Sequence, residues 1–132
     1  MKMIADTNVL IRAVLDDDVI QSSAARRAIS SADQILVSRH ALCELVWLLR
    51  QRYKKSKAEV VKVIRRYLEA DNVITDTAAV EAELAAMEAG ADFADAVIAY
   101  EGRSMGGDTF ASFDKKAVES QAKQGHRAQW LS

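Results

Sequence analysis

Hydrophobic residues recur with two different spacings along the chain, and the two spacings alternate. Short apolar runs typical of buried strands are followed by longer segments in which apolar residues return every three or four positions, as on one face of a helix. The clearest helical segment carries Leu42, Leu45, Val46 and Leu49, which stand at i, i+3, i+4 and i+7. This alternation predicts an α/β fold with mostly parallel strands connected by helices.

The pattern also predicts where each element lies. We expect strands at residues 1–5, 35–37, 72–75, 109–113 and 128–131, and helices at about 9–15, 22–30, 42–49, 56–70, 80–87, 93–100 and 117–123. Ser22 or Ser23 is expected to cap the second helix, and Ser56 with Glu59 matches the capping-box pattern. The helix at 93–100 is apolar almost all round, which predicts a buried helix.

Composition limits the class of protein. A chain of 132 residues that is 50% apolar and 28% charged is expected to fold as one domain over residues 1–132. No stretch approaches the ~20 apolar residues that span a bilayer, and no export signal opens the chain, so we expect a cytoplasmic protein and no membrane partner. The single cysteine, Cys43, cannot form an internal disulfide or a thiolate zinc site alone.

Carboxylates stand where the strands of this pattern end or the following helices begin. In parallel sheets, ligands bind beyond the carboxyl ends of the strands. The acidic residues at such positions are Asp6, Glu44, Asp92, Asp95 and Asp114. Carboxylates that converge repel one another, and a hard cation such as Mg²⁺ or Mn²⁺ removes that conflict. The pattern therefore favours metal-assisted hydrolysis of a phosphodiester.

Most of these residues also have a plainer explanation. Asp92 and Asp114 can serve as helix N-caps, and Asp95 can favour the positive end of its helix. Glu44 lies between apolar neighbours such as Leu42 and Leu45, and a glutamate at an apolar boundary is expected to be paired or functional. The joint placement of the carboxylates, rather than any one of them, supports the metal hypothesis.

Four segments of the chain resemble the acidic motifs of PIN-domain ribonucleases. They are residues 4–10 (IADTNVL), 42–47 (LCELVW), 90–99 (GADFADAVIA) and 112–117 (SFDKKA). The motifs come in the family's order and the likeness covers essentially the whole chain. The resemblance is closest to the VapC-type toxins of bacterial toxin–antitoxin pairs.

This resemblance implies a PIN-like three-layer α/β/α sandwich with a central, mostly parallel sheet, and endoribonuclease activity that depends on Mg²⁺ or Mn²⁺. Carried over by position, it assigns catalysis and metal binding to Asp6, Glu44, Asp95 and Asp114. It assigns supporting roles to Asn8, Asp92 and Ser112, the last at a position where threonine is more usual. It also implies an RNA substrate, a cognate VapB-type antitoxin that blocks the acidic pocket, and a homodimer or toxin–antitoxin hetero-oligomer.

Basic residues are concentrated in one part of the chain. The whole chain has 18 basic and 19 acidic residues, yet 8 of the 18 fall between Arg50 and Arg66, opposed only by Glu59. Such a run is commonly a solvated helix face, but it also suits a polyanion such as RNA. We expect RNA contacts from Lys54 and Lys55, and contacts nearer the cleaved phosphate from Arg12 and Arg39, which stand near strand ends. His40 and His126 are expected at the surface or core edge.

Other acidic α/β folds fit the sequence less well. A receiver-type signalling domain needs paired acids after the first strand and a lysine after the last strand, and neither is present. A haloacid-dehalogenase-like phosphatase needs a second aspartate two places after the first, where Asn8 stands. The main alternative is a PIN-like fold kept as a non-catalytic binding module, for which the discriminating feature is a lost carboxylate. None is lost here.

Overall fold

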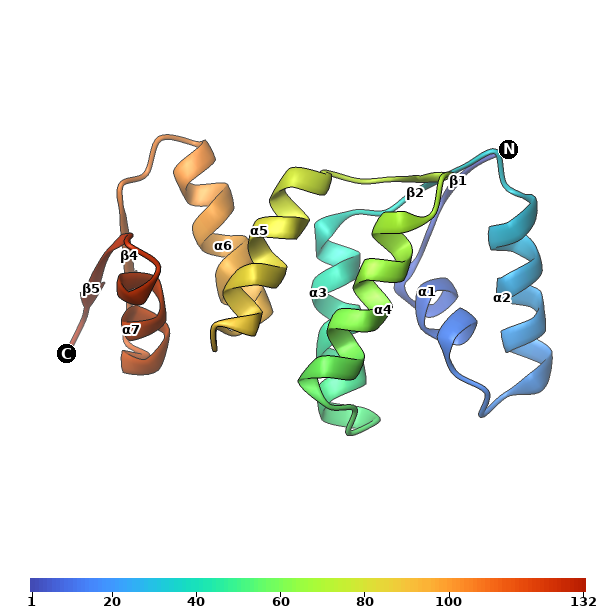
Figure 1. Ribbon diagram of the computed structural model, residues 1–132, viewed down its shortest axis with the longest axis horizontal. Coiled ribbons are helices and arrows are strands. Elements are labelled where there is room, and N and C mark those ends of the chain that lie inside the picture. Colours follow the sequence, from blue (N-terminus) through green and yellow to red (C-terminus); the bar gives the residue numbers. More distant parts are fainter. The chain divides into compact units, whose positions relative to one another are not determined.

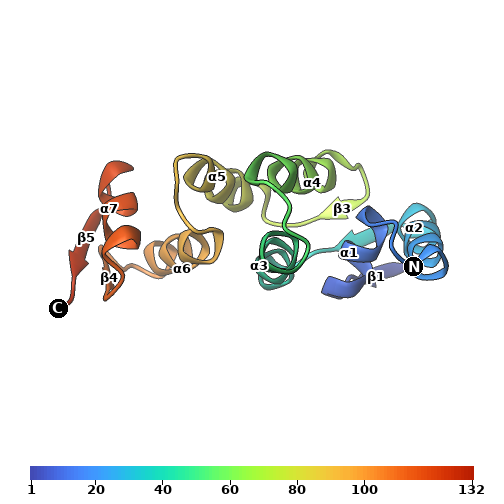
Figure 2. The same ribbon diagram turned by 90° about the horizontal axis from the view of Figure 1, so that it is seen from below.

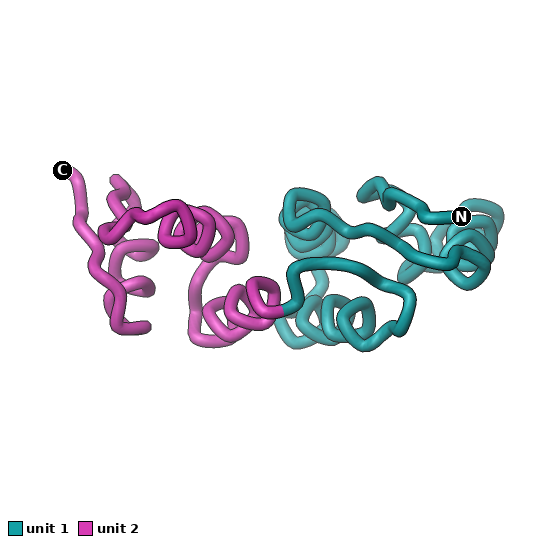
Figure 3. Tube along the Cα trace, turned by 90° about the horizontal axis from the view of Figure 1, so that it is seen from above, with its two compact units in different colours: residues 1–77 teal, residues 78–132 magenta.

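The computed structural model describes all 132 residues and divides the chain into two compact units, Met1–Thr77 and Ala78–Ser132 (Figure 3). Strands and helices alternate in both units. Every strand pair is parallel, in a three-stranded sheet in the first unit and a two-stranded sheet in the second. The α/β class and the parallel pairing predicted from the hydrophobic pattern are confirmed.

The first unit is built on a sheet with the strand order β1-β2-β3. Its strands are β1 (Lys2–Ile4), β2 (Gln34–Leu36) and β3 (Val73–Ile74). Met3 lies opposite Ile35, which in turn lies opposite Val73. The connecting helices are α1 (Thr7–Val14), α2 (Val19–Ser31), α3 (Arg39–Trp47), the π-helical turn η1 (Leu48–Arg52) and α4 (Lys57–Glu69) (Figure 1). Parallel pairing brings the carboxyl ends of these strands to one edge, where α1 and α3 begin.

The second unit carries a shorter parallel ladder. Its elements are α5 (Thr77–Glu88), α6 (Phe93–Ser104), β4 (Thr109–Ser112), α7 (Lys115–Lys123) and β5 (Arg127–Trp130). β4 pairs with β5 from Thr109 opposite Arg127 to Ser112 opposite Trp130, and α7 packs beside both strands (Figure 2). α6 begins after the turn at Gly90, and α7 begins directly after β4.

Side-chain caps fix where several helices begin, and they correct one prediction. Neither Ser22 nor Ser23 caps α2. The cap is Asp18, whose side chain accepts a hydrogen bond from the Gln21 N–H at 3.0 Å. Ser22 is instead buried inside the helix, where its hydroxyl donates to the Leu15 carbonyl. The acidic residue before the helix is itself a good cap, so the helix starts earlier than its apolar pattern indicates.

The helix at 93–100, predicted to be buried, is buried on one face. In α6 the side chains of Phe93, Ala96 and Val97 are buried, whereas Ile98 is 60% exposed. Phe93, Ala96 and Val97 lie on one side of the helix at spacings of three and four residues, and Ile98 falls outside that face. An apolar composition alone therefore overstated how much of this helix is covered.

The predicted capping box is present and helps to hold α4 in place. The Ser56 hydroxyl accepts from the Glu59 N–H, and the Glu59 carboxylate accepts from the Ser56 N–H, both at 3.1 Å. Further along, the Tyr67 hydroxyl donates to the Leu10 carbonyl of α1 at 2.6 Å. Burial raises the pKa of Tyr67, so this hydroxyl keeps its proton. None of the helices has the length and apolar character that crossing a bilayer requires.

Candidate functional site

Asp6 and Glu44, far apart in the sequence, are brought together in the first unit by Thr7. Asp6 follows β1 and caps α1, and its Oδ1 accepts from the Thr7 N–H at 2.8 Å. The Thr7 side chain is buried, and its Oγ1 donates to Oε2 of Glu44 at 3.4 Å. The first and second acidic motifs therefore lie beside one another, as the carboxyl ends of adjacent parallel strands require.

Glu44 has a second partner that the sequence analysis did not connect to the site. Its Oε1 lies 2.7 Å from Nε2 of His40, one helical turn earlier on α3. His40 is at the surface, as expected, but its contact with a candidate ligand was missed. The available signal was the four-residue spacing of the two side chains on one helix. Glu44 is thus held from two sides, by Thr7 and by His40.

Asp92 and Asp114 act as helix caps in the second unit. Asp92 caps α6 through Oδ2, which accepts from the Asp95 N–H at 3.1 Å. Asp114 caps α7 through Oδ1, which accepts from the N–H groups of Lys116 and Ala117 at 3.0 and 3.4 Å. The Ser112 hydroxyl in turn accepts from the Asp114 N–H at 3.0 Å. The simpler explanation for Asp92 and Asp114 is confirmed.

Asp95 lies close to two other carboxylates, those of Asp92 and Asp114. It lies in the first turn of α6 and is partly buried. Partial burial, together with the negative charges of Asp92 and Asp114, raises the pKa of Asp95 above its usual range. Asp92 and Asp114 are therefore each close enough to Asp95 to repel its negative charge. A bound divalent cation would remove that repulsion.

The donor set suits a hard cation by its chemistry. Carboxylate oxygens are the ligands that Mg²⁺ and Mn²⁺ prefer, and a capping carboxylate keeps lone pairs after accepting one or two N–H groups. Helix N-termini also favour the negative charge that Asp6, Asp92 and Asp114 carry. The structure does not, however, assemble three or more Asp, Glu, His or Cys side chains within ligating range of one point.

The basic residues expected near the cleaved phosphate are engaged by other groups. Arg12 donates to Oδ1 of Asp17 at 2.6 Å and to the hydroxyl of Tyr53 at 2.7 Å. Arg39 is largely buried, and its Nη1 lies 3.6 Å from Oδ2 of Asp76. Asn8, the residue expected to support Asp6, lines a cavity of about 610 Å³ together with Arg12 and Tyr53. The supporting role of Asn8 stays a prediction.

Lys54 and Lys55 lie in the turn between η1 and α4. Lys54 is exposed and adopts a φ of 53°, a left-handed backbone conformation that disfavours side chains other than Gly, Asn and Asp. Arg52 stacks its guanidinium over the neighbouring Tyr53 ring, with 5.9 Å between the guanidinium carbon and the ring centroid. The turn separates two runs of basic residues that the sequence presents as one stripe.

Comparison with known proteins identifies the family of the chain. A family model described as the PIN domain matches residues 3–122, a range that includes all four acidic segments. The chain belongs to the PIN domain family. No curated protein matches it significantly. PIN domains are generally metal-dependent nucleases, so this PIN domain has a nuclease-type fold.

Proposed function

We propose that this PIN domain is a cytoplasmic, Mg²⁺- or Mn²⁺-dependent endoribonuclease that acts as the VapC-type toxin of a toxin–antitoxin pair. In this account it cleaves cellular RNA and so stops translation and growth. The observation that carries the proposal is the crowding of carboxylates around Asp95, whose pKa is raised by burial and by Asp92 and Asp114. A carboxylate whose pKa is perturbed in this way at the start of a helix is a candidate for cation binding.

The candidate ligands are Asp6, Glu44, Asp95 and Asp114. When bound, the metal ion supplies a Lewis acid that lowers the pKa of water and offsets charge growing on the phosphate. Thr7 and His40 orient Glu44, which either ligates through a water or acts as a general base. Asp92 fixes the first turn of α6, and Ser112 fixes the backbone of Asp114. These contacts support the roles that the family motifs imply.

The basic candidates would bind the RNA backbone. Lys54 and Lys55 lie in the turn between η1 and α4 and are suited to phosphates of the RNA backbone away from the cleaved bond. Arg12 and Arg39 would act nearer the reaction, and each must exchange or share its carboxylate partner, Asp17 or Asp76, to do so. The proposed partners are the RNA substrate and a VapB-type antitoxin, in a homodimer or a toxin–antitoxin hetero-oligomer.

The proposal is tested by inducing the protein in cells and by assaying it in vitro. Induction is expected to arrest growth, and co-expression of a small open reading frame adjacent to its gene is expected to rescue it. The purified protein is expected to cleave RNA in Mg²⁺ or Mn²⁺ and to stop when EDTA is added. Asp71→Asn, which neutralises an exposed acid between α4 and β3, should behave as wild type in both assays.

Three results would count against it. Cleavage that persists in EDTA would remove the metal from the account. RNA binding without cleavage in any divalent cation would favour the alternative, a PIN-like binding module. Cleavage in vitro without growth arrest would keep the nuclease but remove the toxin.

A further inference from the structure

The first unit has a second concave surface, which neither Asp6 nor Glu44 lines. A cavity of about 240 Å³ lies between the end of α1 and the face of α4. Its floor is apolar, with Leu15, Leu49 and Val60 all buried. Its rim is basic, with Lys55, Lys62 and Arg66 around the opening. Nothing in the acidic motifs involves these residues.

The three cations are held on ordered backbone. Lys62 and Arg66 are one helical turn apart on α4, so they project from the same face. Lys55 lies in the turn before α4, and its backbone is fixed at both ends. Its N–H donates to the Leu49 carbonyl at 2.8 Å, and its carbonyl accepts from the Arg50 guanidinium at 3.1 Å. The backbone positions of the three cations are therefore fixed by the fold.

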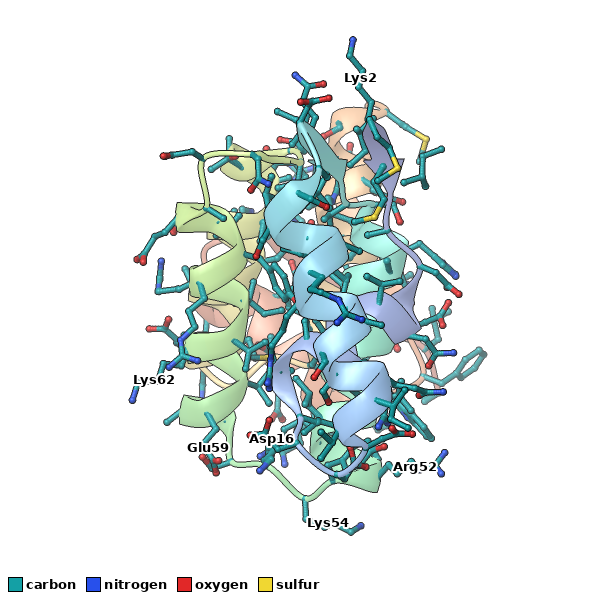
Figure 4. The ribbon with its side chains drawn as sticks, turned by 90° about the vertical axis from the view of Figure 1, so that its right-hand side faces the viewer. Lys2, Asp16, Arg52, Lys54, Glu59 and Lys62 are labelled. Carbon is teal, nitrogen blue, oxygen red and sulfur yellow. The ribbon has the colours of Figure 1, made fainter.

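Glu59 is the only acid on this rim, and it is already occupied. Its carboxylate accepts the Ser56 N–H in the capping box, and this hydrogen bonding, reinforced by the charges of Lys55 and Lys62, lowers the pKa of Glu59. Lys55 and Lys62 line the same cavity as Glu59. Figure 4 shows Glu59 and Lys62 projecting from α4 at the end of the unit that also carries Lys54. Three cations against one anion leave the cavity positive.

We propose that this cavity binds a phosphate–ribose segment of the RNA substrate, at a distance from the cleaved bond. The inference rests on the proposed function and extends it to substrate length. Asp6 caps the start of α1, whereas the cavity lies at the end of that eight-residue helix. At 1.5 Å per residue the two are about 12 Å apart along α1. A short RNA therefore reaches the acidic residues alone, and a longer one reaches both.

The dimensions and charge favour RNA over an acidic helix of a protein partner. A cavity of about 240 Å³ has the volume of a cube roughly 6 Å on a side, whereas a helix with its side chains is about 10–12 Å wide. A phosphate needs only cations near its oxygens, and a ribose can lie against the apolar floor. The first unit as a whole also carries 13 basic and 10 acidic residues, whereas the second carries 5 and 9.

The test measures RNA binding to the full chain in EDTA, where metal-dependent cleavage cannot occur. The probe is a fluorescein-labelled single-stranded RNA of about 20 nucleotides. Each lost phosphate contact removes about 0.7 from the slope of log affinity against log salt. Relative to 1 M salt, this slope corresponds at 0.1 M salt to about 5-fold in affinity per contact. Lys62→Gln/Arg66→Gln, which removes two contacts, is therefore expected to weaken binding by about 25-fold. The matched control is Arg27→Gln/Lys123→Gln, which removes two exposed cations from α2 and α7 and should bind almost as wild type.

A gain-of-affinity variant keeps the test independent of folding. Glu59→Gln preserves the capping box, because glutamine can replace glutamate there, and removes the one repelling charge. It is expected to bind the RNA several-fold more tightly than wild type. In Mg²⁺, the cavity variant should raise KM for the long RNA with kcat unchanged, and should cleave a short RNA as wild type does.

Equal RNA affinity of the wild type and Lys62→Gln/Arg66→Gln at every salt concentration would overturn the inference. Loss of binding to a polyglutamate peptide, with RNA binding retained, would also overturn it and would identify the cavity as a site for an acidic polypeptide. Failure of the proposed function looks different. In that case no RNA is cleaved in any metal, whether or not the cavity variants bind it more weakly.

Discussion

At the scale of single residues, the aspartates have two compatible roles. Asp6, Asp92 and Asp114 each cap a helix through one carboxylate, and each stands at a strand end or helix start where a parallel sheet binds its ligands. Capping fixes the direction of the carboxylate and places it at the positive end of a helix dipole. A structural explanation for one of these residues is therefore no argument against a functional one.

Asp95 gives a prediction about stability and pH. Its pKa is raised in the folded chain, so folding favours the protonated acid, and stability is lost as the pH rises through the raised pKa. Asp95→Asn removes that loss. Without metal, the melting temperature of Asp95→Asn is expected to exceed that of the wild type at pH 7.5. The difference in melting temperature should disappear below the ordinary aspartate pKa of about 3.9.

Thermal unfolding in EDTA at the two pH values measures this directly. Asp71→Asn serves again as the control, because Asp71 lies in an exposed turn. A variant at position 95 that melts below the wild type at pH 7.5 would show that the carboxylate is stabilised by a partner rather than strained by its neighbours.

At the scale of elements, local signals predicted most of what was observed. The capping box at Ser56 and the strand–helix order follow from spacing alone. Signals that compete locally were harder to resolve, because Asp18 and Ser22 are both good caps and only packing decides between them. The π-helical turn η1 and the positive φ of Lys54 depend on how α3 meets α4 in space, so no sequence pattern indicated them.

The contact between α4 and α1 yields a prediction at this scale. The Tyr67 hydroxyl is buried and donates to the Leu10 carbonyl. Tyr67→Phe keeps the ring and removes the hydroxyl that donates to that carbonyl, so the free energy of unfolding is expected to fall by about 1 kcal/mol. Urea denaturation measures the change. Unaltered stability would mean that water replaces the hydroxyl and that packing alone joins the two helices.

At the scale of the whole molecule, sequence and structure agree on the α/β class and on the parallel pairing of the strands. The resemblance of four short segments to PIN-domain motifs is matched by a family model over residues 3–122. Contacts made by side chains from separate elements were not predictable, such as those of Arg12 with Asp17 and Tyr53. The basic cavity was missed for the same reason, because it requires α1 and α4 to be placed together.

The account depends most on the aspartates acting through a metal ion. The most direct test is the rate of RNA cleavage as a function of Mg²⁺ concentration for the wild type, Asp6→Asn and Asp95→Asn. Each variant replaces one carboxylate oxygen by an amide nitrogen of similar size. We expect both to lose at least about 100-fold in rate at saturating Mg²⁺, the scale of losing one group that stabilises developing charge. Wild-type rates for either variant across the whole range of Mg²⁺ would contradict the account.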